Sequence, residues 1–334
     1  MGAAKQFWPG AVAVSGGSDS LALMLLLRDW AKKAGLPPPV ALSVDHALRP
    51  ESGREASKVL RWAKAAGLRG HLLMRKGKAP RSDIESAARE ARYRLMGEWA
   101  KHNGVKAIYV GHTRDDQAET FLLRLARGSG VDGLAAMRAV SPYPLNEFRA
   151  LVLVRPLLTV EREVLRDFLR ERGQAWLDDP MNDDPRFARV QIRKAWPVLE
   201  AIGLSKGRIA DAAAHLARAR TALDAVSQAV LVRACRFDGE EALIDPTALT
   251  DAPRELGLRA LAAILMAVSG TAYRPRFERL ERLYDQIRLG SLGGGGTLHG
   301  CRLAPASAAR ALYGGGTLLV RREEIRRKAK KNAD

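Results

Sequence analysis

The sequence contains few cysteines and no long hydrophobic segment. Only Cys235 and Cys301 occur among 334 residues, and neither belongs to a CxxC pair. This pattern argues against a disulfide framework and a structural zinc site, so we expect a reducing, cytoplasmic location. The longest apolar run, residues 21–27, is far too short to span a bilayer, and the N-terminal stretch lacks the apolar core and cleavage site of a signal peptide. We therefore expect no membrane partner.

Acidic residues are scarce relative to basic ones. Lys and Arg number 55 against 37 Asp and Glu, which gives a formal net charge of +18. Because such an excess repels itself, it usually occurs in proteins that bind a polyanion. Nucleic acid is the first partner to consider and a membrane surface the second, while a generally basic proteome is the alternative without a specific partner.

Short apolar runs alternate with amphipathic stretches in the first part of the chain. We expect strands at 11–14, 40–44, 71–74, 107–110 and 150–154, with helices between them. This alternation predicts an α/β fold, in which a twisted parallel sheet is covered by helices on both faces. Ligands of such sheets bind beyond the carboxyl ends of the strands. We assign residues 1–197 to this domain.

The pattern changes in residues 198–334, which we expect to form a smaller, mainly helical domain. Apolar residues recur at three- and four-residue steps from 205 onward, and two more helices are expected at 255–268 and 276–288. Short strands are expected at 297–303 and 317–320. The basic tail, 321–331, fits a solvated end and RNA contact equally well.

A serine- and glycine-rich loop follows the first strand and precedes a helix. It reads Ser15-Gly16-Gly17-Ser18-Asp19-Ser20. The glycines permit unusual dihedral angles, and the hydroxyls and free N–H groups at the helix start favour an anion. Asp19 beside phosphates makes sense if Mg²⁺ lies between them. The sequence has no GxxxxGK[ST] motif, so this is not a Walker loop. The alternative is a glycine turn capped by Ser and Asp.

The hexapeptide resembles the signature loop of the N-type ATP pyrophosphatases, the PP-loop superfamily. That resemblance implies an ATP-consuming enzyme whose loop holds the pyrophosphate of ATP while the α-phosphorus is attacked. The products would be an adenylated substrate and pyrophosphate.

Further motifs narrow the superfamily to one family. The second expected strand ends in a segment containing His46, and the fourth ends in Gly111-His112. The remaining motifs are Thr113-Arg114-Asp115-Asp116-Gln117-Ala118-Glu119-Thr120, Arg89 to Tyr93, Arg127 to Leu134, Arg155-Pro156-Leu157-Leu158, and Asp179 to Arg193. Their order and spacing over residues 11–200 resemble the tRNA(Ile)-lysidine synthase family. Met181 and Val190-Gln191 depart from its usual pattern.

The resemblance implies a two-step ligation on RNA. ATP adenylates the C2 oxygen of the wobble cytidine in the CAU anticodon of tRNA(Ile). The ε-amine of free L-lysine then attacks C2 and displaces AMP, which gives lysidine. The cofactors are therefore ATP and Mg²⁺, and residues 198–334 become the candidate tRNA-binding domain. A dimer is left open as the oligomeric state.

The acidic residues are the candidates for catalysis and for lysine. We expect Asp19 to contact Mg²⁺ through the phosphates, with Asp116 as a second ligand. Asp115, Asp116 and Glu119 share one face at the start of a helix, which suits a lysine cradle and a general base. The lysine ligands would be Asp116 and Glu119. The alternative is that these acids cap the helix N-terminus, where negative charge is favoured.

The remaining candidates bind ATP or RNA. The expected ATP-binding residues are Ser15, Gly16, Gly17, Ser18, Asp19, Ser20, His46, Gly111 and His112. Either histidine suits adenine, phosphate, the target base or a backbone hydrogen bond. The expected tRNA contacts are Arg89, Arg92, Arg127, Arg186, Arg189 and Arg193, of which the first three also suit phosphates of ATP. Tyr93 and Phe187 offer stacking surfaces, although core packing is favoured for Tyr93.

Two other functions compete with this interpretation. A tRNA thiolation enzyme of the same superfamily would rely on cysteine, but Cys235 and Cys301 lie outside every motif. A non-catalytic RNA-binding protein would not need Asp19 or the pair Asp115-Asp116.

Overall fold

The computed structural model describes residues 6–45, 52–75, 84–178, 184, 186–271 and 273–323. The chain divides into two compact units, Met1–Ala217 and Arg218–Asp334, and the boundary falls within one long helix. Within the described ranges, no helix combines the length and apolar character needed to cross a bilayer.

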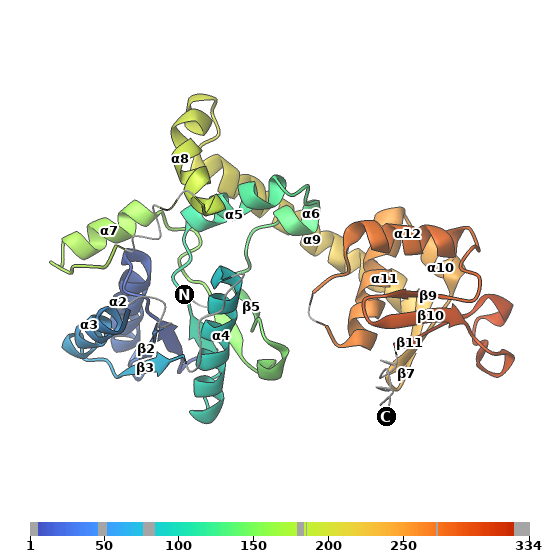
Figure 1. Ribbon diagram of the computed structural model, residues 1–334, viewed down its shortest axis with the longest axis horizontal. Coiled ribbons are helices and arrows are strands. Elements are labelled where there is room, and N and C mark those ends of the chain that lie inside the picture. The colour runs from blue at the N-terminus through green and yellow to red at the C-terminus, as the bar shows by residue number, and fades with distance from the viewer. Residues whose placement is uncertain are drawn as a thin grey trace, which may run out of the picture. The chain divides into compact units, whose positions relative to one another are not determined.

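The first unit is built on a six-stranded sheet in the order β3-β2-β1-β4-β6-β5 (Figure 1). Its strands are β1 (Ala11–Ala13), β2 (Val40–Asp45), β3 (Gly70–Met74), β4 (Ala107–Tyr109), β5 (Val140–Pro142) and β6 (Val152–Val154). All neighbours run parallel except β5, which pairs antiparallel with β6 at the edge. The five strands expected from the sequence are present, and the predicted α/β class is confirmed.

Helices cover both faces of this sheet. They are α2 (Ser18–Lys33), α3 (Ser52–Ala65), α4 (Ile84–His102), α5 (Arg114–Leu125), α6 (Val131–Leu134), the short 3-10 helix η1 (Asn146–Phe148), α7 (Arg162–Arg170) and α8 (Ala188–Ala201). Apolar side chains of α2, α3 and α7 form one core with β1, and those of α4 form a second core with β2, β4 and β6. The strands are therefore buried between layers, as apolar parallel strands require.

The sheet reverses its strand order at β1. The chain adds β2 and β3 on one side of β1, then crosses back to add β4 on the other side. Loops that follow the carboxyl ends of β1 and β4 therefore diverge at a topological switch point, where open α/β sheets form their binding crevices. The serine–glycine loop and the Gly111-His112 segment are these two loops.

The helices α7 and α8 are among those that were not expected from the sequence. Helix α7 carries Leu165 and Leu169 four residues apart, both buried, which is a readable amphipathic signal. Helix α8 contains Pro197 in its interior. Proline is unfavourable there, so the local sequence argued against a helix at that point.

The second unit combines helices with a five-stranded antiparallel sheet in the order β7-β8-β11-β10-β9. Helix α9 (Lys206–Ala234) leads into it. The remaining elements are β7 (Cys235–Asp238), β8 (Glu241–Ile244), α10 (Pro246–Thr250), α11 (Arg254–Ser269), α12 (Phe277–Arg288), β9 (Gly296–Leu298), β10 (Cys301–Pro305), η3 (Ala308–Arg310), η4 (Gly314–Gly316) and β11 (Leu318–Arg322). Side chains of α11 and α12 pack against the sheet in one core.

The β structure of this unit differs from the sequence prediction. The single strand expected at 297–303 is wrong, because His299 and Gly300 adopt positive φ angles of 59° and 71° and reverse the chain between β9 and β10. The hairpin β7–β8 was missed, although Gly239, with φ 60°, stands at the first central position of its two-residue turn, where glycine is a common hairpin signal.

Candidate active site

The loop after β1 has the backbone geometry of an anion site. Gly16 has φ 97°, and an added Cβ would lie 2.6 Å from the Leu177 side chain, so only glycine suits this position. Gly17 then forms the N-cap of α2 without any side-chain cap. The first N–H groups of a helix have no intrahelical partner, and the helix dipole favours negative charge there. This loop therefore fits a polyphosphate.

The loop serines have different surroundings. The Ser20 hydroxyl donates to the Gly17 carbonyl at 2.9 Å and accepts from the Ser15 N–H at 3.2 Å, so it braces the loop from inside. The Ser15 hydroxyl lies 3.2 Å from the same oxygen. The Ser18 hydroxyl instead donates to Asp19 Oδ1 at 3.1 Å. These contacts hold the loop in one shape, which limits the reorganisation required when phosphates bind.

Gly111, at the end of β4, brings the second loop against the first. An added Cβ there would lie 2.9 Å from the carbonyl carbon and oxygen of Asp19 and 3.0 Å from the Ser20 nitrogen. Only a residue without a side chain permits this approach of two backbones. The requirement for glycine at 111 therefore follows from packing against the phosphate loop.

Asp116 has two roles at the start of α5. Its Oδ2 accepts from the Thr113 N–H at 2.8 Å, and the Thr113 hydroxyl caps the Asp116 N–H in return, so the two residues form a capping box. Its Oδ1 faces away from the cap and accepts from Arg162 Nη2 at 3.2 Å. The capping alternative for Asp116 is thus correct for one oxygen and leaves the other for the site.

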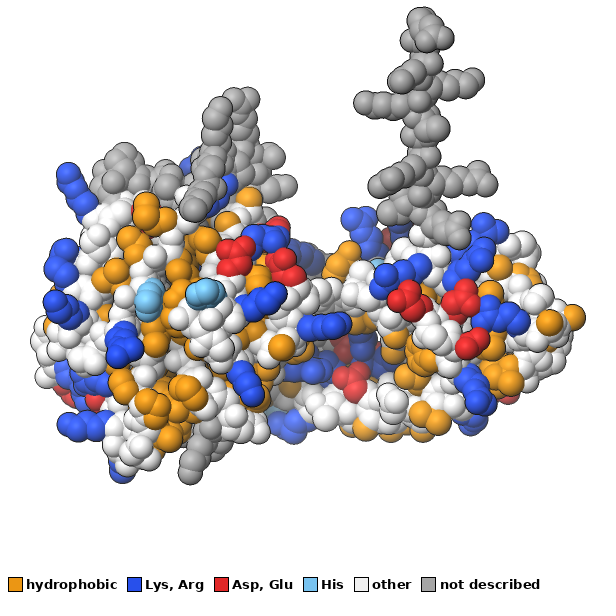
Figure 2. All heavy atoms as spheres, turned by 90° about the horizontal axis from the view of Figure 1, so that it is seen from below, with side chains coloured by type: hydrophobic (Ala, Val, Ile, Leu, Met, Phe, Trp, Pro, Cys, Tyr) orange, Lys and Arg blue, Asp and Glu red, His pale blue; other side chains and the backbone are white. Residues whose placement is uncertain are grey.

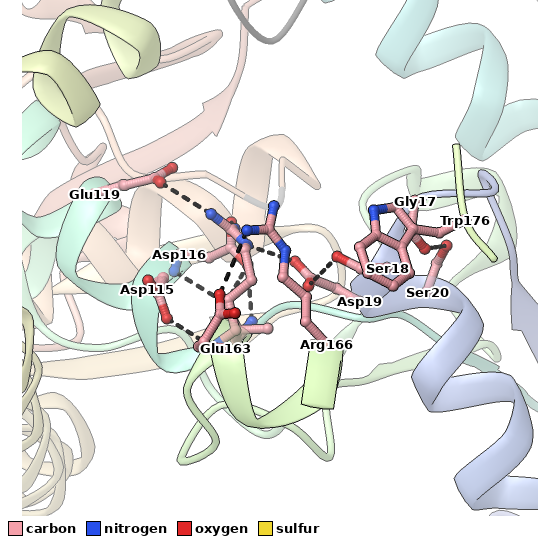
Figure 3. Close-up of polar contacts among 12 residues, drawn as sticks. Gly17, Ser18, Asp19, Ser20, Asp115, Asp116, Glu119, Glu163, Arg166 and Trp176 are labelled. Carbon is pink, nitrogen blue, oxygen red and sulfur yellow. Dashed lines mark hydrogen bonds and ion pairs between the residues drawn. The ribbon is translucent and has the colours of Figure 1, made fainter. Parts of the chain in front are cut away.

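Arg162, the first residue of α7, joins all the candidate acids. Its Nε donates to Asp19 Oδ2 at 2.9 Å, and its Nη1 lies 3.6 Å from Glu119 Oε1. Its backbone N–H donates to Asp115 Oδ2 at 2.9 Å. Figure 3 shows the labelled acids of α5 facing Asp19 at the start of α2. Asp19 and Asp116 therefore contact the same guanidinium, and their role as Mg²⁺ ligands stays a prediction.

Other basic residues surround the same acids. Glu119, only 1% exposed, accepts from Arg193 Nε at 2.7 Å and Nη2 at 3.2 Å. Arg189 Nη1 lies 3.6 Å from Asp116 Oδ1, and Lys206 Nζ lies 2.9 Å from Asp115 Oδ1. Two arginines expected at the tRNA backbone are therefore also ion-pair partners of the acidic cluster.

Burial and nearby charges shift the pKa values of Asp19 and Asp115 in opposite directions. Burial raises the pKa of Asp19 above its usual 3.8, nearby Asp116 adds to the rise, and Arg162 opposes it. Burial also works against the charged form of Asp115, but hydrogen bonds from the Arg162 N–H and Lys206 outweigh it and lower the pKa. The surroundings of Asp19 therefore favour its protonated form even with Arg162 beside it, whereas those of Asp115 favour the carboxylate.

His112 enters the site as a neutral group. Burial lowers its pKa from 6.5 to about 4, with Arg155 and Arg89 adding to the decrease and Asp116 opposing it. Its Nδ1 is buried and has no hydrogen-bond partner among the described residues. A buried nitrogen of this kind is costly to leave unpaired, so it fits a ligand hydrogen bond.

The remaining predicted residues lie at the surface, in the core or outside the described residues. Arg89, Arg92, Arg127 and Arg186 are exposed, and Arg186 forms a local ion pair with Asp184 at 2.7 Å. Tyr93, on α4, is buried in the core, as favoured, and Phe187 is half-buried. His46 lies outside the described residues.

Arg162 and Lys206 are the site residues that sequence reasoning missed. A signal exists for Arg162, because a cation is unfavourable in the first turn of a helix unless something else compensates. Lys206 begins α9, far beyond the motifs, and only the folded chain brings it to Asp115.

The fold and the anion loop define a class, the PP-loop proteins. A family model described as the PP-loop domain matches residues 5–199. The solved structure of the U34-tRNA thiolase NcsA from Methanococcus maripaludis, which carries a [4Fe-4S] cluster, is similar with a TM-score of 0.51 over 62% of this chain and 72% of that one. At 17% identity this likeness shows the fold alone.

Curated relatives narrow the class. A protein of Ruegeria pomeroyi named tRNA(Ile)-lysidine synthase is 41% identical to this chain, over 83% of this chain and 65% of the relative. A protein of the same name from a Bradyrhizobium species is 40% identical, over 86% of this chain and 82% of the relative. A Methylobacterium relative is 39% identical over 99% and 94%. The chain belongs to the tRNA(Ile)-lysidine synthase family, as the motifs predicted.

Proposed function

We propose that this chain uses ATP to adenylate the C2 oxygen of the wobble cytidine in the CAU anticodon of tRNA(Ile), and then ligates free lysine to C2. The observation that carries the proposal is the meeting of the anion loop with Asp19, Asp116 and Glu119 around one cation position. An adenylating ligase for an amine requires two parts, a loop that binds the polyphosphate and carboxylates that bind the ammonium. We call them the loop half and the acidic half.

The loop half supplies binding of the polyphosphate. The uncapped start of α2 and the close approach at Gly111 make a fixed set of N–H donors, which stabilise charge that develops during attack on the α-phosphorus. Mg²⁺ would be held by Asp19 and Asp116, whose carboxylates already lie within reach of one guanidinium. When bound, it would neutralise charge on the phosphates.

The acidic half supplies a place for the lysine ammonium. Asp116 and Glu119 are buried carboxylates, so the ammonium of a lysine bound beside them would form an ion pair with them. The attacking amine must lose a proton, and an adjacent carboxylate of α5 is the acceptor that the geometry offers, with Asp115 as the third member of the group. AMP is then the leaving group.

The basic surface supplies binding of the tRNA. Figure 2 shows Lys and Arg side chains spread over the visible face, whereas acidic side chains gather in a few small groups. We assign phosphate contacts to the predicted tRNA-binding arginines, Arg89, Arg92, Arg127, Arg186, Arg189 and Arg193. The neutral His112 would bind adenine or the target base, and His46 stays with the ATP site. We place the reaction in the cytoplasm and tRNA recognition in residues 198–334 as well.

ATP labelled at the α-phosphate tests this order of steps. With tRNA(Ile) but without lysine, label should remain attached to the tRNA as an adenylate. Addition of lysine should release it as AMP. Label that never enters tRNA, or AMP release that ignores lysine, would contradict the proposal.

A further inference from the structure

The Arg162 side chain occupies a position between carboxylates of two different helices. Its guanidinium hydrogen-bonds Asp19 of α2 and Asp116 of α5, and lies 3.6 Å from Glu119 one turn further along α5. No local sequence rule brings these groups together, because Asp19 and Arg162 are 143 residues apart. The guanidinium neutralises charge where the proposed function requires a divalent cation.

The backbone of Arg162 is fixed, while its side chain keeps some exposure to solvent. Its N–H is held by Asp115, and α7 packs against α2 through the buried Leu165 and Leu169. The side chain is 18% exposed and borders the uncapped start of α2. A polyphosphate on that helix start would offer the guanidinium a second anion, and guanidinium groups bind phosphate oxygens readily.

We propose that Arg162 is an internal counter-ion that competes with a divalent cation for Asp19 and Asp116, and thereby makes metal binding depend on nucleotide. The proposal rests on the proposed function, since that function places the metal on these acids. Without nucleotide, Arg162 stays on the acids and the cation is excluded. With nucleotide, the guanidinium turns to the phosphates and the carboxylates become available.

Removal of the positive charge of Arg162 should change the metal affinity of Asp19 and Asp116. With Arg162 neutralised, Arg189 at 3.6 Å is the remaining described cation near Asp116, and Asp19 keeps only the Ser18 hydroxyl. Two largely buried carboxylates with one fewer cation attract a divalent ion more strongly. Loss of the guanidinium should therefore raise metal affinity in the absence of nucleotide, whereas a purely structural role would leave it unchanged or lower.

The test measures Mn²⁺ binding to the full chain by the electron paramagnetic resonance signal of free Mn²⁺, with and without α,β-methylene ATP. We expect weak binding to the native protein without nucleotide and tighter binding with it. Arg162→Gln should bind Mn²⁺ at least about tenfold more tightly than the native protein without nucleotide. Arg170→Gln, an exposed change on the same helix, is the matched control and should behave as the native protein.

Two further variants decide the outcome. Adding Asp19→Asn to Arg162→Gln should remove the gained affinity; a gain that persists lies elsewhere and overturns the proposal. If Arg162→Gln does not fold, Arg162→Lys takes its place. A shorter cation reaches fewer carboxylates, so this variant should bind Mn²⁺ with intermediate affinity. An affinity equal to that of the native protein overturns the proposal. Equal Mn²⁺ binding by folded Arg162→Gln and native protein also overturns it. Lysidine formation by the native protein is measured separately, so failure of the proposed function is distinguishable.

Discussion

Arg162 Nε donates a hydrogen bond to Asp19 Oδ2 at 2.9 Å, and both side chains are largely buried. The bond connects the first turn of α7 to the first turn of α2, so the phosphate loop and the acids of α5 are held in register by one side chain. Changes to any member of this group should therefore act on ATP chemistry before they act on RNA binding.

Asp19→Asn should abolish ATP turnover while tRNA binding remains within about twofold of native. The amide keeps the size of the side chain but loses the charge that a metal ion needs, and loss of one such electrostatic group commonly costs about a hundredfold or more in rate. Pyrophosphate release and filter binding of tRNA measure the two properties. An equal loss of both would indicate misfolding instead of a local role.

Glu119→Gln should lower the free energy of unfolding by about 3 kcal/mol, because it removes the charge of a carboxylate that is only 1% exposed and leaves Arg193 without a carboxylate partner among the described residues. Glu163→Gln is the control, since Glu163 is exposed on α7 and its pairs with Arg166 and Arg170 should contribute less than about 1 kcal/mol. Urea denaturation measures both. Similar midpoints for the two variants would show that the buried pair is not a stabilising contact.

Gly111→Ala should weaken ATP binding by about tenfold and destabilise the fold by about 1–3 kcal/mol, because the new methyl group meets the Asp19 carbonyl. Gly130→Ala meets no atom within 4 Å and has φ −80°, so it serves as the matched control. Nucleotide titration and thermal unfolding read the two effects. Native ATP affinity in Gly111→Ala would refute the close approach of the two loops.

His112 should make the protein less stable in mild acid. Its pKa is about 4 in the folded state against 6.5 in the unfolded chain, so the unfolded state binds the extra proton first. Stability is therefore lost as pH falls from about 6.5 to about 4, by up to about 3 kcal/mol from this group. His112→Asn should flatten that part of the profile in denaturant titrations at several pH values. Parallel profiles for the two proteins would show that His112 titrates normally.

Local patterns in the sequence predicted the elements and site residues whose structure depends on neighbouring residues in the chain. The loop from Ser15 to Ser20, the acids at the start of α5 and the five parallel strands all follow from residue types at fixed spacings. Arg162 and Lys206 were missed because their partners are distant in sequence and meet them only through tertiary packing. Helix α8 was missed because packing overrides the unfavourable Pro197.

The most direct measurement is mass spectrometry of nucleosides from tRNA(Ile) with a CAU anticodon, after incubation with the protein, ATP, Mg²⁺ and lysine. The account predicts that the wobble cytidine is converted to lysidine only when ATP and lysine are both present, and that Asp19→Asn leaves it unmodified. An unmodified cytidine with the native protein under these conditions, or its modification without ATP, would contradict the account.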